Sequence, residues 1–266
     1  MKRLILSLTL AGSLCFSAEA SSLLDGDDDL FNCGSGASLD ALSTKTVVAT
    51  VCTGTLGSDD VIVAKINDAF SLGWYFAVDG SDPPNRDWVT FQHPGSTAYG
   101  EWVTPALSTS DNTCYTIGVT HDTTNINNDP VIYINGVSQS LTERDAPSGS
   151  FTTDAAETFT IGGRIGSSLS GTGTIEEVCY CNQIATPAQM LLLASNLNLM
   201  CHQVCGSNAR LYQPLDDKPA GTALNGMTFI DRSGNGNTCT GDDGANNTGL
   251  TAAGTIKTNY PIGILN

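Results

Sequence analysis

The heptapeptide VIYINGV, which runs from Val131 to Val137, carries the sharpest local information about the fold. Four residues that favour strands are followed by Asn135-Gly136, and both of these residues tolerate the positive φ angles that a type I′ turn requires. We therefore predict a strand over residues 131–134 that folds back on a second strand between Val137 and Ser140. Such a hairpin is a unit of an antiparallel sheet.

Segments of the same kind occur on both sides of this hairpin. They are short, rich in β-branched and aromatic residues, and separated by turn-forming residues. They comprise residues 46–51, 60–66, 72–78, 88–92, 114–121, 159–162 and 173–180. Only 14% of all residues are charged, while Gly, Thr, Ser and Asn are abundant, and this composition also favours strands and turns over helices. The predicted fold class is all-β, an antiparallel sandwich.

One helix interrupts the pattern. Thr186-Pro187-Ala188-Gln189 combines an N-cap residue, a proline in the first turn and a capping-box partner. We expect one short helix from Pro187 to about Asn196. Cys201 and Cys205 lie beyond it, in what we interpret as a stapled linker to the last segment of the chain.

Five segments together resemble the concanavalin A-like, laminin-G-like jelly-roll family. In chain order they are an LDG-x-DD segment within Leu23 to Leu39, the IYING hairpin, IGGR, GTIEEV and a short helix that begins near a proline. The resemblance covers residues 21–200 and implies a concanavalin A-like jelly-roll β-sandwich. It implies no particular ligand, because members of one fold family differ in function.

The C-terminal segment, residues 201–266, departs from the order of that family. Leu211 to Asp216 and Asp231 to Asn237 resemble stretches that relatives place before the LDG-x-DD segment. Three arrangements are open: the segment closes the same sandwich, adds a strand to a neighbouring molecule, or forms a loose appendage. We expect closure of the same sandwich, because a sheet edge is better covered than left open.

Residues 1–20 have the features of a secretory signal peptide. Lys2 and Arg3 precede an apolar stretch, and Ala18-Glu19-Ala20 is a typical cleavage site. The apolar stretch is too short for a membrane span, and no later segment is apolar enough for one. We therefore expect a secreted protein, extracellular or on the cell surface. Its formal net charge of −16 opposes binding to nucleic acid.

Cleavage after Ala20 would leave eight of the nine cysteines, an even number in an exported chain. This pattern predicts disulfides rather than thiol chemistry, although the sequence does not choose among the 105 possible pairings. The alternative of a zinc site at Cys201 and Cys205 lacks a second ligand pair at suitable spacing. The disulfide candidates are Cys33, Cys52, Cys114, Cys179, Cys181, Cys201, Cys205 and Cys239.

A calcium site is the candidate metal centre. Asp25, Asp27 and Asp28 offer oxygen ligands within a few residues, and Glu177 could supply a second wall. The resemblance implies that such ions lie at the rim of the sandwich. The alternative is a turn with a solvated acidic rim.

Aromatic side chains in the middle of the chain are candidates for stacking on sugar rings. They are Trp88, Tyr99 and Trp102. Trp102 follows Tyr99-Gly100-Glu101 in a stretch that we expect to be a loop, which makes it the first choice. The alternative is that these rings are buried in the core of the sandwich.

The sequence does not predict an enzyme. Glu176 and Glu177 are the adjacent carboxylates that could serve glycoside hydrolysis, but successive residues of a regular strand face opposite sides. His93 and His121 fit the ends of strands, and no GxSxG nucleophile motif occurs. We expect a secreted, non-catalytic binding or adhesion module that recognises a glycan or an extracellular protein surface, with calcium as a candidate cofactor. The alternative is a self-associating structural subunit of an extracellular assembly that exchanges its C-terminal strand.

Overall fold

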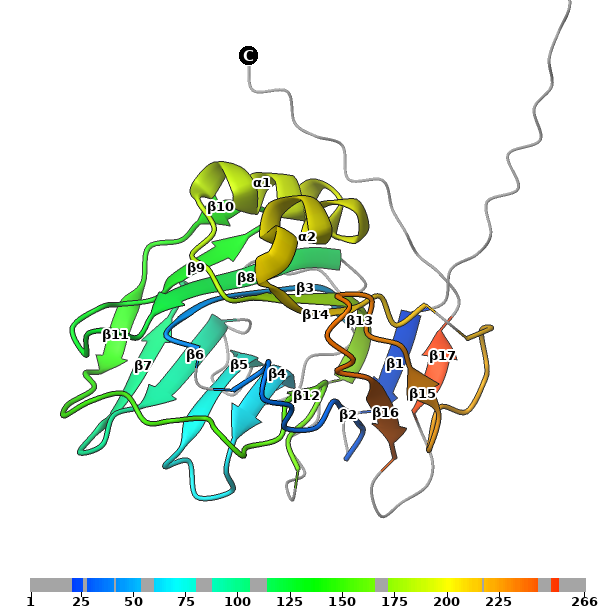
Figure 1. The fold of residues 1–266 in the computed structure, drawn as a ribbon, viewed down its shortest axis with the longest axis horizontal. Helices are drawn as coiled ribbons and strands as arrows, with labels where there is room; N and C mark the ends of the chain where they lie inside the picture. The colour runs from blue at the N-terminus through cyan, green and yellow to red at the C-terminus, as the bar shows by residue number, and fades with distance from the viewer. Residues whose placement is uncertain are drawn as a thin grey trace, which may run out of the picture.

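The computed structural model describes residues 21–25, 28–40, 42–53, 60–79, 88–105, 114–165, 172–216, 218–243 and 250–253. The predicted signal peptide lies outside the described residues. Within these ranges the chain forms two antiparallel sheets that pack face to face, with two helices against one of them (Figure 1). The prediction of an all-β antiparallel sandwich is confirmed.

Sheet A contains the predicted hairpin and the longest strands. Its order is β10 (Val137–Ser138), β9 (Val131–Ile134), β8 (Cys114–Asp122), β3 (Thr44–Thr53), β13 (Thr172–Cys181), β1 (Ser21–Asp25) and β17 (Thr251–Ala253), with β14 (Ala209–Gln213) also paired to β13. At the β9–β10 turn, Asn135 has a φ of 50° and Gly136 a φ of 78°, as a type I′ turn requires. A Cβ at Gly136 would lie 2.7 Å from the Cα of Leu191, so this glycine also allows the helix to approach.

Sheet B forms the second layer. Its order is β11 (Thr142–Asp145), β7 (Tyr99–Val103), β6 (Trp88–Pro94), β5 (Gly73–Asp79), β4 (Asp60–Ile66), β12 (Thr160–Ile161), β2 (Leu30–Asn32), β16 (Cys239–Asp242) and β15 (Thr228–Phe229). Strand β7 was expected to be a loop. It pairs with β6 and β11 on its two sides, and these ladders hold the stretch extended.

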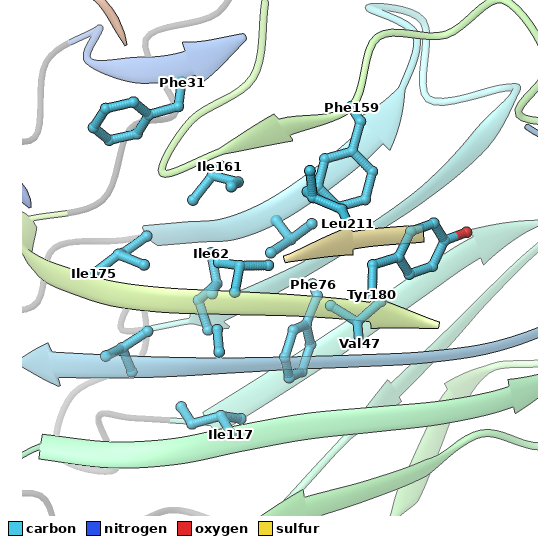
Figure 2. Packing of buried hydrophobic residues seen from close by; sticks show 14 of the residues in the cluster. Phe31, Val47, Ile62, Phe76, Ile117, Phe159, Ile161, Ile175, Tyr180 and Leu211 are labelled. Atoms are coloured by element: carbon cyan, nitrogen blue, oxygen red, sulfur yellow. The ribbon is translucent and has the colours of Figure 1, made fainter. Parts of the chain in front are cut away.

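The main core fills the space between the two sheets. Alternate residues of each strand point inward, as the two-residue period of a strand requires. Figure 2 shows part of this cluster, in which Phe31, Phe76 and Phe159 pack among aliphatic side chains from both sheets. Each fully buried side chain of this size contributes about 2 kcal/mol by leaving water.

Two helices cover the outer face of sheet A. The first, α1 (Pro187–Ser195), has the predicted capping box at Thr186 and Gln189. The prediction of one short helix was wrong, because the expected linker forms a second helix, α2 (Leu197–Cys205). Met190, Leu193 and Leu197 of the helices join a second buried cluster with outward-facing residues of sheet A.

All eight predicted cysteines form disulfides. Cys179 and Cys181 lie two residues apart on β13 and share its outer face, while Cys201 and Cys205 are one helical turn apart on α2. The pairs Cys179–Cys201 and Cys181–Cys205 therefore fasten α2 onto β13. Cys52–Cys114 joins β3 to β8, and Cys33–Cys239 joins the end of β2 to β16.

The C-terminal segment contributes strands to both sheets. In sheet A, β14 pairs with residues 178–181 of β13, and β1 pairs with residues 172–175 along the same edge. In sheet B, β16 pairs with β2. Figure 1 shows the orange and red C-terminal strands beside the blue N-terminal ones. These described residues of the segment thus lie within the same sandwich as the rest of the chain.

Candidate functional site

The two outer faces of the sandwich differ in what covers them. The helices pack on sheet A, whereas neither helix lies over sheet B (Figure 1). On the outer face of sheet B, Val61, Ala64, Ile66, Tyr75 and Ala77 form a small buried cluster, and polar residues lie on the strands to either side of it.

The strand registers define one row of residues across this outer face. Each member is paired with the next one on the neighbouring strand, so neighbours lie about 4.8 Å apart. The row, which we call the cross-strand row, consists of Glu101, Gln92, Tyr75, Ala64, Thr160, Asn32 and Thr240.

A polar cleft opens at the β2–β16 end of this row. It is open to solvent, has a volume of about 410 Å³ and is lined by Asn32, Cys33, Gly34, Asn225, Thr238, Thr240, Gly241 and Asp242. Its lining offers amide, hydroxyl and carboxylate groups together with the backbone of two glycines. Such a lining can form many hydrogen bonds with a ligand that is rich in hydroxyl groups.

Local sequence explains how these groups come together. The Oδ1 of Asn32 accepts a hydrogen bond from the backbone N–H of Gly34 at 2.9 Å, in a turn where Gly34 has a φ of 74°. A Cβ at Gly241 would collide with the carbonyl oxygen of Leu224. The glycine therefore allows the preceding loop to approach β16 closely, and this loop brings Asn225 to the cleft.

None of the aromatic residues and calcium ligands that were predicted above lines this cleft. Asn32 and Thr240 are about two hundred positions apart, and only the pairing of β2 with β16 joins them. A signal was present in Cys33 and Cys239, since each cysteine lies next to one of these residues and the two cysteines form a disulfide.

Tyr99 lies on the same outer face, near the opposite edge of sheet B. Its side chain is 45% exposed, and a hydrogen bond to the Asp145 carboxylate raises the pKa of its phenol. Two residues further along β7, and so on the same face, Glu101 accepts a hydrogen bond from Gln92 at 3.1 Å and lies 3.6 Å from the guanidinium of Arg144. Tyr99 thus stays a candidate for ligand contact.

Trp102 cannot stack on a ligand in this structure, and that prediction was wrong. The side chain is 1% exposed, packs in the main core and donates a hydrogen bond from Nε1 to Asp129 Oδ1 at 3.0 Å. It points inward because β7 is a strand and not a loop, so its residues alternate between the two faces. The side chain of Trp88 lies outside the described residues, although its backbone begins β6.

The predicted calcium ligands do not converge on one ion. Asp25 pairs with Thr172, so Glu177 lies five positions further along β13, about 16 Å away at the usual rise of a strand. Ligands of one calcium ion each lie about 2.4 Å from it, so this set cannot share an ion. Asp27 and the side chain of Asp25 lie outside the described residues, and Asp28 is half-buried in the segment that precedes β2.

A β-bulge corrects the argument about Glu176 and Glu177. The register between β13 and β3 shifts between Ile175 and Glu177, so Glu176 is an extra residue in its strand. Glu177 pairs with Thr50, and Glu176 Oε1 lies 3.7 Å from Cys52 Sγ. Both carboxylates therefore lie on the outer side of sheet A, contrary to the expectation from strand periodicity.

These two glutamates are nevertheless poorly placed for catalysis. They are only 7% and 8% exposed, and Glu177 accepts a hydrogen bond from the Tyr212 hydroxyl at 3.2 Å. Burial, reinforced by the charge of Glu177, raises the pKa of Tyr212, so its hydroxyl stays a donor. A substrate could not reach the pair without displacing the groups that cover it.

His93 and His121 form a buried pair between the sheets. Their Nδ1 atoms lie 3.5 Å apart, while each Nε2 faces a backbone carbonyl oxygen, of Thr152 at 3.2 Å and of Asn128 at 3.1 Å. Burial and the charge of Lys45 lower the pKa of His121 to about 3 and that of His93 well below its usual value. The pair is therefore neutral at physiological pH and belongs to the core.

No helix in the described part of the chain has both the length and the apolar character that a membrane crossing requires.

No family model matches the sequence, and no curated protein matches it significantly. Among solved structures, the fold is similar to that of a Bacteroides ovatus protein named "putative carbohydrate binding protein", with 16% identity and a TM-score of 0.61. This match covers 90% of the present chain and 60% of the other, so the chain spans less than two thirds of that protein's length.

Two further structures are similar. A SAP-like pentraxin from Limulus polyphemus is 12% identical with a TM-score of 0.50, over 67% of this chain and 82% of the pentraxin. The CBM40 of the Ruminococcus gnavus IT-sialidase matches with 12% identity and a TM-score of 0.47, over 67% and 98% of the two chains, and no argument rests on it. At these identities the likeness establishes the β-sandwich fold, and the narrower resemblance to laminin-G-like domains stays a prediction.

Proposed function

We propose that this chain is an exported, non-catalytic carbohydrate-binding module whose primary site is the polar cleft over β2 and β16. The observation that carries the proposal is the cleft itself, a cavity of about 410 Å³ lined by amide, hydroxyl and carboxylate groups on the sheet face without helices. The name of the structurally similar Bacteroides protein supports the same class of function. The four disulfides support an oxidising compartment, and hence export.

The charge of the chain narrows the class of glycan. Asp242 lines the cleft, and the formal net charge is −16. A carboxylated or sulfated sugar would be repelled at this surface, so we propose a neutral glycan. Hydroxyl groups of such a sugar would bond to the side chains of Asn32 and Thr240, which lie opposite each other on paired strands.

Substitutions in the cleft test this proposal. We expect Thr240→Val and Asn32→Asp each to weaken glycan binding about tenfold, since one lost hydrogen bond is worth about 1.4 kcal/mol. Both changes preserve the fold: valine keeps the β-branched shape of Thr240, and aspartate keeps the oxygen that accepts the bond from Gly34. Affinity electrophoresis in laminarin, xylan, arabinan and galactan measures the effect.

Asn127→Ala is the matched control for these variants, because Asn127 is exposed in the loop between β8 and β9, away from the cleft. It should bind as the unsubstituted protein does. Unchanged mobility shifts for both cleft variants, in a gel where the unsubstituted protein is retarded, would reject the cleft as the binding site.

Calcium stays part of the proposal only for the acidic segment that joins β1 to β2. Asp28 and the fully buried Asp29 belong to it, but Glu177 does not. Removal of calcium with a chelator is expected to lower the melting temperature by several degrees, and added calcium, but not magnesium, should restore it. An unchanged melting curve in the chelator would remove calcium from the account.

The pairing of the C-terminal strand does not favour self-association by strand exchange. The strand that would be exchanged, β14, pairs with β13 of its own chain. We therefore favour the binding module over the structural subunit.

A further inference from the structure

Phe70 has a large aromatic side chain that does not line the binding cleft. It lies in the loop between β4 and β5, and its side chain is 38% exposed. Its φ is 52°, a value that bulky residues rarely adopt. Strained backbone of this kind persists only where the surroundings hold it, and it is often found at binding sites.

The loop around Phe70 is built to hold this conformation. The Oδ1 of Asn67 accepts hydrogen bonds from the backbone N–H groups of Ser71 at 2.9 Å and Leu72 at 3.1 Å. The backbone N–H of Phe70 donates to the Asn67 carbonyl at 3.1 Å, and the N–H of Asn67 donates to Leu72. These bonds fix the position from which the ring projects.

Two side chains fix the ring itself, Tyr75 of β5 and Arg164, which follows β12. The guanidinium carbon of Arg164 lies 4.0 Å from the centre of the Phe70 ring, and Tyr75 meets the ring edge-on at 5.8 Å between centroids. Arg164 is 8% exposed and donates from Nη1 to the carbonyl oxygens of Asn67 and Asp68. One face of Phe70 is therefore packed, while more than a third of its side chain stays in contact with solvent.

This ring lies over the same face of sheet B as the cleft. Tyr75, which it touches, belongs to the cross-strand row, and three strand spacings separate Tyr75 from Asn32. That separation is about 14 Å. A single sugar ring cannot reach both places, but a chain of several sugar residues can.

We propose that Phe70, backed by Arg164 and Tyr75, is a second subsite that stacks on a sugar ring, so that the ligand is an extended oligosaccharide rather than a single terminal sugar. This inference rests on the proposed function. Aromatic rings present an apolar face that matches the C–H face of a pyranose or furanose, and a ring held in advance loses little freedom when it binds.

The test compares short and long ligands of one linkage. The probes are the disaccharides and hexasaccharides of the laminari-, cello-, xylo- and arabino- series, titrated by calorimetry into the full chain. Phe70→Asn removes the ring but suits the positive φ, since asparagine tolerates this region, and so folding is preserved. We expect it to weaken binding of the hexasaccharide about tenfold and to leave binding of the disaccharide unchanged, whereas Phe70→Tyr should bind both ligands as the unsubstituted chain does.

Leu191→Asn is the matched control, because Leu191 is an exposed apolar residue on α1, against the other sheet. Equal binding of the hexasaccharide by the unsubstituted chain and by Phe70→Asn would overturn the second subsite while leaving the proposed function in place. An equal loss for both ligand lengths would also overturn it, because Phe70 would then belong to the primary site. Failure of the unsubstituted chain to bind any probe would reject the proposed function and this subsite together.

Discussion

Replacing Cys33 and Cys239 together by alanine is expected to lower the free energy of unfolding by about 4 kcal/mol. The two cysteines are 206 residues apart, the longest separation among the four disulfides. A crosslink that closes a long loop removes much of the entropy of the unfolded chain, although the other disulfides shorten this loop. It also joins β16 of the C-terminal segment to the end of β2, so its loss should loosen that segment first.

Urea denaturation measures the loss of stability, and limited proteolysis measures the loosening. Cys179→Ala with Cys201→Ala is the matched control, because Cys181–Cys205 still fastens α2 to β13 in that variant. We expect the control to lower the free energy of unfolding far less and to leave the C-terminal segment resistant to protease. A larger loss in the control than in the Cys33 and Cys239 variant would contradict the role assigned to the long-range disulfide.

Acidification from pH 6.5 to 3 is expected to destabilise the sandwich through His93 and His121. The pKa of His121 falls to about 3 in the folded chain from 6.5 in the unfolded one, so the unfolded state binds more protons across this interval. The contribution of neutral His121 to the free energy of unfolding is therefore fully present above pH 6.5. It is lost as the pH falls towards 3, by on the order of 4 kcal/mol. The cause is burial first, then the charge of Lys45.

The hydrogen bonds of the pair point to the same result. Each Nε2 faces a carbonyl oxygen, which can only accept, so each Nε2 carries the proton of its neutral ring. A further proton would have to enter between the two Nδ1 atoms and would place a charge in the core.

Denaturation curves across this pH range provide the measurement. His121→Asn should flatten the decline in stability, because asparagine does not titrate. His202→Gln, at an exposed position on α2, should leave the decline unchanged. Titration of the many carboxylates is common to all three proteins and cancels in the comparison. An equally steep decline in His121→Asn would show that other groups cause the acid sensitivity.

Local sequence was sufficient for the elements that local chemistry determines. The Asn135-Gly136 turn and the capping box at Thr186 depend on residues within a few positions of each other, and both are present as predicted. The two disulfides between α2 and β13 could also have been predicted. Cys-x-Cys on a strand and Cys-x-x-x-Cys on a helix each place both sulfurs on one face, so the two spacings match.

Features that depend on the pairing of strands far apart in the sequence could not be predicted from local sequence. Strand periodicity placed Glu176 and Glu177 on opposite faces of the strand. This prediction failed because a bulge shifts the register between β3 and β13 at this point. Trp102 turned inward because β6 and β11 pair with β7 on its two sides. The polar cleft exists only because β16 returns to β2.

The central claim is that a neutral glycan binds the cleft over β2 and β16, and amide chemical shifts in a titration with the tightest-binding oligosaccharide test it most directly. The account predicts that the largest shift changes occur at Gly34, Asn225, Thr238 and Thr240, which line the cleft. Changes centred on α1 and α2, with none at these four residues, would contradict it.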